Sequence, residues 1–302
     1  MINKKIPGYG VVTAMLTPLQ QDETVDVASV KKLVNRMTDA GIHGIFTMAT
    51  SGECMRLPPE QQDLLIKTVA ETNQGKSTLY IGVSACGTAE AIRNIRRAEQ
   101  AGADVIVSTL PFYYNSITVR EQVEFYKALA QSTALPILMY NIPSNVGGKI
   151  EIETARLLRD EANIVGIKDS SGDLDYFNAL LQLQRDDFRV LSGVEFHCTQ
   201  ALKQGASGIV PSLSNIYPNA YMQLWEYIQQ KDFEKADILQ NKFNRINNIH
   251  KQYSSRLAVM TCRKVLLEYE GLGNAYMTHP YTPVPEDLKK LLLQTATDLQ
   301  LN

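Results

Sequence analysis

The sequence of 302 residues predicts an α/β protein, a (β/α)8 or TIM barrel with a C-terminal helical extension. Short apolar runs rich in β-branched residues alternate with amphipathic helical patterns eight times, over about 220 residues, whereas an open doubly wound sheet typically has five or six strands. Runs such as Ile45 to Ala49 also lack strict polar alternation, as strands covered on both faces of a parallel sheet do. We therefore expect a closed barrel.

The expected strands are short and bounded by turn residues. They cover Gly10 to Thr17, Gly44 to Thr50, Thr78 to Ala85, Asp104 to Leu110, Pro136 to Asn141, Ile164 to Asp169, Arg189 to Gly193 and Gly208 to Pro211.

Helices are expected between these strands. A helical period links Val27, Val30, Val34 and Met37, and Thr118 to Glu121 matches a capping box. A weak internal repeat places Gly41, Gly102 and Gly205 each between a helix pattern and a strand. Glycine at that position adopts the left-handed conformation that turns the chain back toward the sheet.

The strand pattern stops after Asn215, and three amphipathic helices are expected beyond it. They run through Ala236 to Tyr253, Cys262 to Leu267, and Leu288 to Leu299. The first of them is a candidate for the barrel's own eighth helix. We expect a barrel domain over 1–230, which holds the active site, and a helical subdomain over 231–302 packed on it.

Charge and composition argue against a nucleic-acid-binding, membrane-bound or secreted protein. Thirty basic against 32 acidic residues leave a net charge of −2, which gives no electrostatic footprint for nucleic acid or an anionic membrane. No apolar run approaches the roughly 18 residues of a membrane span, and Pro7, Gly8 and Gly10 interrupt any signal-peptide core. We expect a cytoplasmic protein whose partner is a small molecule or another copy of itself.

Cysteine and histidine spacing predicts neither a disulfide framework nor a metal site. The four cysteines, Cys54, Cys86, Cys198 and Cys262, are far apart and lack a C-x-x-C pair, so buried reduced thiols are expected. The four histidines show no i, i+4 pairing and no neighbouring cysteine. We expect no metal and no organic cofactor.

The chemistry of a β/α barrel is carried by residues at the C-terminal ends of its strands. Lys168 closes the apolar strand that starts at Ile164, and partial burial there would favour the neutral amine that attacks a carbonyl. The alternative is a lysine that snorkels to solvent or pairs with Asp169. The residues alone leave these two readings open.

Tyr140 closes the preceding strand, 28 residues before Lys168, which is one β/α unit. The two side chains are therefore expected on neighbouring strand ends, where a phenol can carry protons to and from a lysine adduct. The alternative is a core tyrosine whose hydroxyl is satisfied by the protein.

Two further loops at strand ends carry polar or aromatic groups. Thr50, Ser51, Gly52 and Glu53 form either a carboxylate-binding loop or a simple polar turn, and Pro111 to Asn115 form an aromatic cluster or ordinary rim packing. A lysine, a tyrosine and a hydroxyl-lined pocket together suit a 2-oxo acid such as pyruvate, which forms an imine and then an enamine with the lysine. That chemistry requires no cofactor.

The chain resembles the pyruvate-dependent class I aldolase family that includes dihydrodipicolinate synthase and N-acetylneuraminate lyase. The resemblance rests on Thr13 to Pro18, Thr50 to Glu53, Pro111 to Asn115, Tyr140 to Pro143, Gly166 to Lys168, and Leu191 to Gly193, in this order.

This resemblance implies roles for five residues. Lys168 would form the Schiff base and Tyr140 would transfer protons. Thr50 would orient the Tyr140 hydroxyl, and Ser51 with the loop amides would bind the pyruvyl carboxylate. Tyr114 matches a tyrosine that reaches across a dimer interface to a neighbouring active site, and a homotetramer built from dimers is implied.

The positions that select the aldehyde agree less well with dihydrodipicolinate synthases. Asn145 stands where those enzymes have an arginine, and it cannot form a charge-assisted bidentate pair with a carboxylate. Glu195 matches one of two acidic residues that hold sugar hydroxyls in the sialic acid lyases, although Phe196 replaces the other. Ser212 matches a further hydroxyl contact. The substrate-binding positions implied by the resemblance are Ser51, Asn145, Ser170, Glu195, Val210 and Ser212.

These positions favour a 2-oxo-3-deoxy sugar acid, cleaved or formed by an N-acetylneuraminate lyase-like or 2-keto-3-deoxygluconate aldolase-like enzyme. The alternative within enzymes is 4-hydroxy-tetrahydrodipicolinate (dihydrodipicolinate) synthase. The alternative outside enzymes is a sensor of 2-oxo acids on a catalytically retired barrel.

Overall fold

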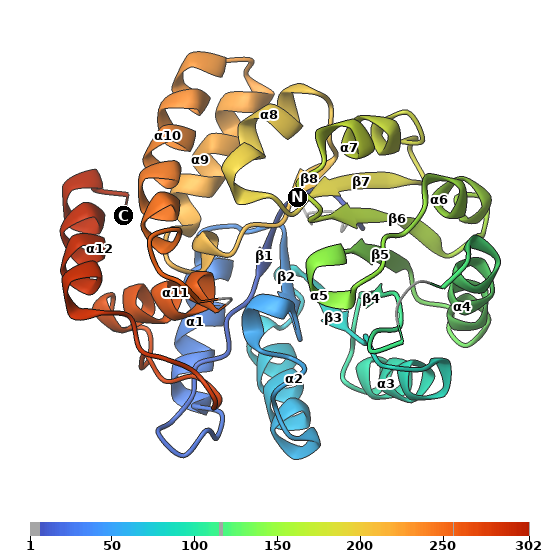
Figure 1. Ribbon diagram of the computed structural model, residues 1–302, viewed down its shortest axis with the longest axis horizontal. Helices are drawn as coiled ribbons and strands as arrows, with labels where there is room; N and C mark the ends of the chain where they lie inside the picture. Colours follow the sequence, from blue (N-terminus) through green and yellow to red (C-terminus); the bar gives the residue numbers. More distant parts are fainter. Residues whose placement is uncertain (1–6, 115–116, 256, 302) are drawn as a thin grey trace.

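A computed structural model describes residues 7–114, 117–255 and 257–301. These residues form a closed barrel of eight strands (Figure 1). All eight strands were predicted in the correct order, and most of them end one to three residues earlier than expected. Their bounds are β1 (Gly10–Ala14), β2 (Gly44–Thr47), β3 (Thr78–Gly82), β4 (Val105–Thr109), β5 (Ile137–Asn141), β6 (Ile164–Asp169), β7 (Arg189–Ser192) and β8 (Gly208–Ile209).

Each strand pairs in parallel with the next, and β8 pairs with β1 to close the barrel. The register between β5 and β6 aligns Tyr140 with Lys168, as their spacing predicted. Because parallel strands joined by helices all end on the same face, the residues that follow the strands gather there.

The helices surround the barrel and continue beyond it (Figure 1). The capping box of Thr118 and Glu121 is present, and Gly41, Gly102 and Gly205 have φ of 76°, 86° and 95°, so both turn predictions are confirmed. The barrel helices are α1 (Val27–Asp39), α2 (Pro59–Asn73), α3 (Thr88–Gln100), α4 (Val119–Gln131), α5 (Pro143–Val146), α6 (Ile152–Leu158), α7 (Leu174–Leu181), α8 (Cys198–Lys203) and α9 (Pro218–Gln229). Short 3₁₀ turns are η1 (Thr50–Gly52), η2 (Glu195–His197) and η3 (Leu213–Asn215).

The C-terminal extension contains α10 (Phe233–His250), α11 (Ala258–Tyr269) and α12 (Glu286–Leu299), which contact one another. The sequence offered the first of these as a candidate eighth barrel helix. The structure gives that place to α9, which the pattern missed and which packs against β1 and α8. Figure 1 shows α10 and α12 outside α9, at the edge of the barrel.

The buried apolar side chains form two clusters, one between the barrel and its helices and one inside the barrel. Side chains that face the helices form the larger cluster, which includes Ile137, Met139 and Ile167. Leu138 and Tyr140 belong to a smaller cluster inside the barrel. Since side chains alternate along a strand, this layering directs the residue after Ile167, which is Lys168, into the barrel.

The cysteines are all free within the described residues, and Cys54, Cys198 and Cys262 are buried as expected. Cys86 is exposed, so the prediction of burial is wrong for that residue. None of the helices in the described ranges is long and apolar enough to cross a membrane.

Candidate active site

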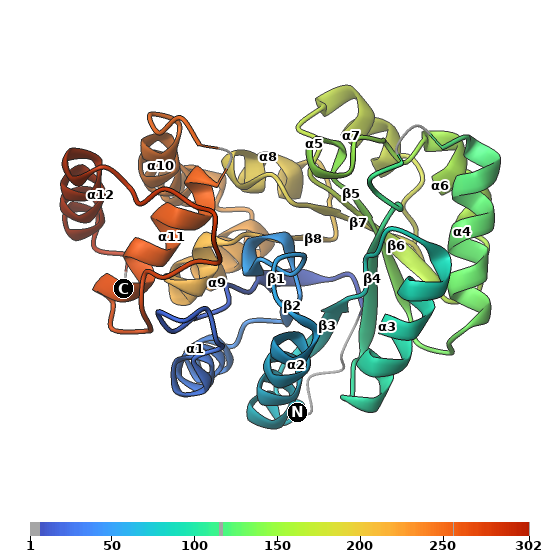
Figure 2. The ribbon, with the colours of Figure 1, turned by 60° about the horizontal axis from the view of Figure 1, so that its bottom comes forward.

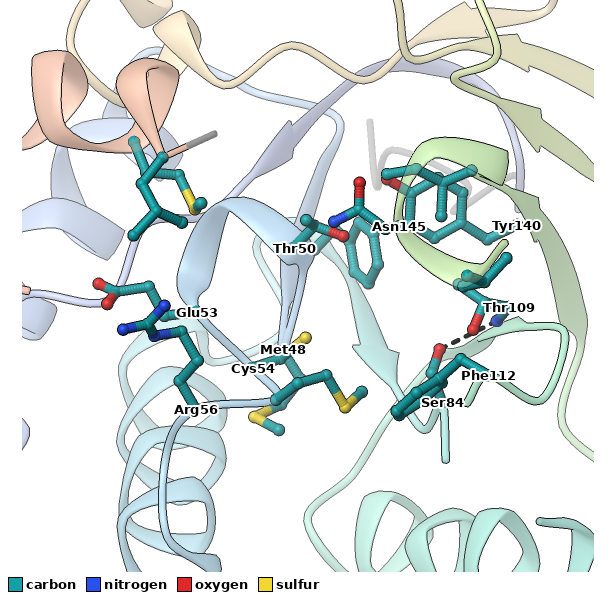
Figure 3. Close-up of a pocket in the computed structure, with 16 residues that line it drawn as sticks. Met48, Thr50, Glu53, Cys54, Arg56, Ser84, Thr109, Phe112, Tyr140 and Asn145 are labelled. Carbon is teal, nitrogen blue, oxygen red and sulfur yellow. Dashed lines mark hydrogen bonds between the residues drawn. The ribbon is translucent and has the colours of Figure 1, made fainter. Parts of the chain in front are cut away.

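A pocket of about 290 Å³ opens where strands β2 to β5 end (Figure 3). Its walls come from those strand ends, from η1 and α5, and from residues just before and within α11. On one side, Ser84 Oγ accepts a hydrogen bond of 2.9 Å from the backbone N–H of Thr109. The lining residues are Phe46, Met48, Thr50, Glu53, Cys54, Met55, Arg56, Ser84, Thr109, Phe112, Tyr140, Ile142, Asn145, Val146, Leu257 and Met260.

Lys168 lies against the aromatic residues of this pocket. Its side chain is buried, with 3% exposed, and Nζ is 3.8 Å from the centre of the Tyr140 ring and 5.2 Å from that of Phe46. Within the described residues, Nζ forms no hydrogen bond or ion pair with another side chain or the backbone. Asp169, the alternative partner, accepts hydrogen bonds from Asn141 and Ser171 instead. A buried primary amine without a counter-ion is available for chemistry.

Gly193 leaves the space that the Lys168 side chain occupies. A Cβ at this position would be 2.7 Å from Lys168 Cε and 2.1 Å from Ser170 Oγ, so one of these side chains would have to move. The backbone N–H of Gly193 donates to Asp169 O at 2.7 Å, which fixes the approach. A larger residue after β7 would therefore have to displace the Lys168 or Ser170 side chain.

Tyr140 and Thr50 line the same pocket, on β5 and η1 respectively. No hydrogen bond joins Thr50 Oγ1 to the Tyr140 hydroxyl in the described part of the chain, so the orienting contact implied by the family resemblance is not formed directly. Ser51 is half-buried in the same turn and is not among the lining residues.

Three other predicted substrate positions lie around the barrel mouth. Asn145 is exposed on α5 and lines the pocket beside Tyr140 (Figure 3). Ser170 is half-buried directly after β6 and donates its backbone N–H to Asn141 O at 2.8 Å. Val210 is buried in the inner apolar cluster with Tyr140. Of these three, Ser170 lies nearest to Lys168 in sequence, and the side chains of both are close to Gly193.

Glu195 has a different environment from the one that we expected. Its carboxylate accepts from the backbone N–H groups of Ser212 and Leu213, from the Tyr221 hydroxyl and from Ser212 Oγ, and it forms a 3.0 Å ion pair with Arg263. Both of its oxygens are therefore occupied by the protein, and its side chain is 12% exposed.

This arrangement does not support the expectation that Glu195 and Ser212 hold a substrate hydroxyl. Burial alone would raise the pKa of the Glu195 carboxyl, but the Arg263 guanidinium and the hydrogen bonds outweigh it and lower that pKa below its usual 4.5. Ser212 Oγ donates to Glu195 and accepts from Arg263 Nε at 3.3 Å. The sequence places a carboxylate at the strand end but does not reveal its counter-ion on α11.

Tyr114 lies outside the pocket. Its side chain is 79% exposed and packs edge-on against the Tyr113 ring, with 5.1 Å between ring centres. Phe112, from the same predicted cluster, does line the pocket. Asn115, the last residue of that cluster, lies outside the described residues.

Several lining residues were not predicted from the sequence. Leu257 and Met260 belong to the C-terminal extension, so a prediction based on the ends of the strands does not include them. Arg56 donates through Nε and Nη2 to Thr278 and Pro280. Cys54 lines the pocket as well, but burial raises the pKa of its thiol to about 12, so it remains an unreactive thiol.

A parallel barrel that holds a buried lysine without an ion pair in the described structure, beside a tyrosine at the strand ends, has the groups that a class I aldolase, a carbon–carbon lyase, uses. The chain belongs to the dihydrodipicolinate synthetase family, whose model matches residues 8–299.

Individual relatives cover nearly the whole chain. A 4-hydroxy-tetrahydrodipicolinate synthase of Methanopyrus kandleri is 30% identical over 294 residues, which are 97% of this chain and 96% of that protein. The crystal structure of the dihydrodipicolinate synthase from Acinetobacter baumannii with pyruvate has 29% identity and a TM-score of 0.90, and covers 98% and 100% of the two chains. A Bacillus anthracis dihydrodipicolinate synthase has 28% identity and a TM-score of 0.89, and covers 97% and 98%.

Proposed function

We propose that the protein joins pyruvate to an aldehyde, or releases pyruvate from the product, through a Schiff base on Lys168. The observation that carries the proposal is the buried Lys168 amine, which has no counter-ion in the described structure and lies 3.8 Å from the Tyr140 ring centre. An amine in that state is the nucleophile that a carbonyl substrate requires. The pyruvate complex of the Acinetobacter baumannii relative supports pyruvate as the first substrate.

The reaction balances without a redox partner. The Lys168 amine adds to C2 of pyruvate, and water leaves as the imine forms. Loss of a proton from C3 gives an enamine, whose C3 then bonds to the aldehyde carbon while the aldehyde oxygen takes a proton. Water finally hydrolyses the imine and frees Lys168, and cleavage follows the same steps in reverse. We assign these proton transfers to the Tyr140 hydroxyl, because the Tyr140 ring lies against the amine, with its centre 3.8 Å from Nζ.

The turn η1 is the proposed site for the pyruvyl carboxylate. Thr50 lines the pocket and Ser51 is half-buried beside it, so hydroxyl and backbone N–H donors are available near Tyr140. We propose that Thr50 acts on the Tyr140 hydroxyl once substrate is bound. Tyr114, exposed in this chain, is proposed to complete the site of a second copy within a homotetramer.

For the aldehyde, 4-hydroxy-tetrahydrodipicolinate synthesis is now better supported than a sugar acid reaction. The relatives compared above carry that synthase name, and the Glu195 carboxylate that was to bind sugar hydroxyls is occupied by Arg263. One observation favours the sugar acid alternative. Asn145 lines the pocket where an arginine would be needed for the carboxylate of aspartate semialdehyde.

A ranking of substrates decides between these two functions. We expect pyruvate-dependent turnover, with kcat/KM for aspartate semialdehyde above that for cleavage of any 2-oxo-3-deoxy sugar acid in a panel. The reverse ranking would make the sugar acid lyase the function. Turnover with neither class, together with saturable pyruvate binding, would support the retired-barrel sensor. A cytoplasmic location and independence of cofactors stay predictions from the sequence.

A further inference from the structure

Two consecutive residues of the C-terminal extension carry buried cations. Arg263 and Lys264 lie in the middle of α11, and both side chains are 0% exposed. Each forms an ion pair with a carboxylate from a different barrel loop, Glu195 after β7 and Glu53 after β2. Figure 2 shows α11 and the segment that follows it beside the barrel loops near β1 and β2. Two buried ion pairs therefore join the C-terminal extension to the loops at the mouth of the barrel.

The Glu53–Lys264 ion pair is buried, and each of its two side chains has further polar partners. Glu53 is also 0% exposed, and its carboxylate lies 3.1 Å from Lys264 Nζ. Its other oxygen accepts from the N–H and the hydroxyl of Thr278 at 2.8 and 2.7 Å. Lys264 Nζ donates to Tyr276 O at 2.8 Å and also to Thr17 O. Neither charge is left without a partner.

These contacts lead directly to η1. Glu53 is the residue that ends this turn, and its N–H donates to Thr50 O at 3.1 Å. Its φ of 59° lies in the left-handed region, which a residue with a side chain adopts only when surrounding contacts hold it there. The Thr17 hydroxyl donates a hydrogen bond to Gly52 O at 2.6 Å. The backbone carbonyl of Thr17 accepts a hydrogen bond from Lys264 Nζ. The turn is thus held by Glu53 on one side and Thr17 on the other.

We propose that Lys264 is a positioning residue for the pyruvyl carboxylate, acting through Glu53 and Thr17 on the turn Thr50–Gly52. This inference rests on the proposed function, because it assigns that turn to pyruvate. Lys264 itself lies behind the turn and contacts no substrate. Its effect is geometric: it fixes the hydroxyl and amide donors of η1 relative to Lys168, so pyruvate is presented to the amine in one orientation.

The Glu195–Arg263 pair provides a matched control on the same helix. It is also a buried ion pair with α11, but it holds η2 and the start of η3 rather than η1. A general loosening of the C-terminal extension would affect both pairs alike. A positioning role for Lys264 predicts that only the Glu53–Lys264 pair controls pyruvate.

The test uses the full-length chain and neutralises each pair completely, so that no buried charge is left unpaired. The first variant is Glu53→Gln with Lys264→Met, and the control is Glu195→Gln with Arg263→Met. For each, the pyruvate concentration that half-saturates borohydride trapping of Lys168 is measured, with near-UV circular dichroism to verify folding. We expect roughly a 10- to 100-fold rise for the first variant, as for a small misplacement of a bound reactant, and a change within about threefold for the control.

Equal shifts in the two variants, or no shift in the first, would overturn the proposal. If the first variant does not fold, Thr17→Val decides, because it removes the hydroxyl bond to Gly52 O without touching a charge. A rise in half-saturating pyruvate is expected for it, and an unchanged value would contradict us. Failure of the wild-type chain to trap pyruvate on Lys168 would instead contradict the proposed function, so the two failures are distinguishable.

Discussion

Two lysines are buried in the part of the chain that the structure describes, and their surroundings differ completely. Lys168, inside the barrel, lies over the rings of Tyr140 and Phe46 and forms no ion pair in the described structure. Lys264, on α11, pairs with Glu53 and donates to two backbone carbonyls. Burying an ammonium group is costly unless partners compensate it, so the fold compensates one lysine and leaves the other available.

Buried cations at the mouth of this barrel therefore have two different roles. A charge with all its partners in the protein stabilises the arrangement of loops, as Lys264 and Glu195 do. A buried amine such as that of Lys168, which has aromatic rings beside it but no carboxylate partner in the described structure, is the kind of group that concentrates where chemistry occurs. Substitutions of the two lysines should therefore have opposite effects on turnover and on stability.

The largest effect is expected for Lys168→Met. Removal of the nucleophile should abolish pyruvate-dependent turnover, while the free energy of unfolding stays the same or rises because an uncompensated amine leaves the interior. A turnover assay and urea unfolding followed by the single tryptophan, Trp225, measure both quantities. Retained turnover, or a large loss of stability, would show that Lys168 has a structural role, as Lys264 does.

The next effect concerns Tyr140, the aromatic neighbour of Lys168. Tyr140→Phe keeps the ring under the amine and removes only the hydroxyl, so imine trapping with pyruvate should persist. Turnover should fall by roughly 10²- to 10⁴-fold, the usual effect of removing a general acid or base. Steady-state kcat compared with the rate of imine trapping checks this. Normal turnover in the variant would show that Tyr140 is a packing residue.

Lys264→Met should show the opposite behaviour to Lys168→Met. Loss of this cation leaves the buried Glu53 carboxylate without its counter-ion, which costs about 3–5 kcal/mol of the free energy of unfolding. Urea unfolding at neutral pH measures it, with Glu53→Gln and Lys264→Met combined as the matched control that recovers part of the loss. An unchanged stability would mean that the ion pair contributes nothing.

The smallest effect concerns the pH dependence of the free energy of unfolding. It arises from His250, whose pKa responds to the nearby charges of Arg263 and Glu195. Burial, with Arg263 nearby, lowers the pKa of His250 from its usual 6.5 to about 4. As pH falls from 6.5 to about 4, the unfolded chain binds a proton that the folded chain does not, so the free energy of unfolding should decrease.

The lowered pKa of Glu195 adds a further decrease below its unfolded value of 4.5, where the unfolded carboxyl protonates first. Thermal unfolding of the wild type and of His250→Asn between pH 7.5 and 4.5 checks the histidine contribution. The variant should lose less stability than the wild type over this range. An equal loss of stability in the wild type and the variant would show that His250 does not contribute to the pH dependence.

The repeating part of the molecule was predictable from the sequence because it depends on local patterns. Strand runs, the glycines after helices and the 28-residue spacing of Tyr140 and Lys168 each follow from periods along the chain. The helix α9 carries such a pattern as well, since Tyr221, Leu224, Trp225 and Ile228 share one buried face, although it was not among the predicted helices.

The ion pairs were not predictable, because their partners meet only through the folded chain. Glu195 and Arg263 are 68 residues apart, and α11 reads as an ordinary amphipathic helix. The sequence therefore suggested an open carboxylate for substrate where the structure has a closed pair. Leu257 and Met260 reach the pocket for the same long-range reason.

The central claim is that Lys168 is the lysine that reacts with pyruvate, and one measurement tests it most directly. The wild-type chain is incubated with pyruvate, reduced with borohydride, digested and mapped by mass spectrometry. We expect one reduced adduct, on the peptide that carries Lys168, and none in Lys168→Met. An adduct on any other lysine, Lys264 included, or no adduct at all, would contradict the assignment.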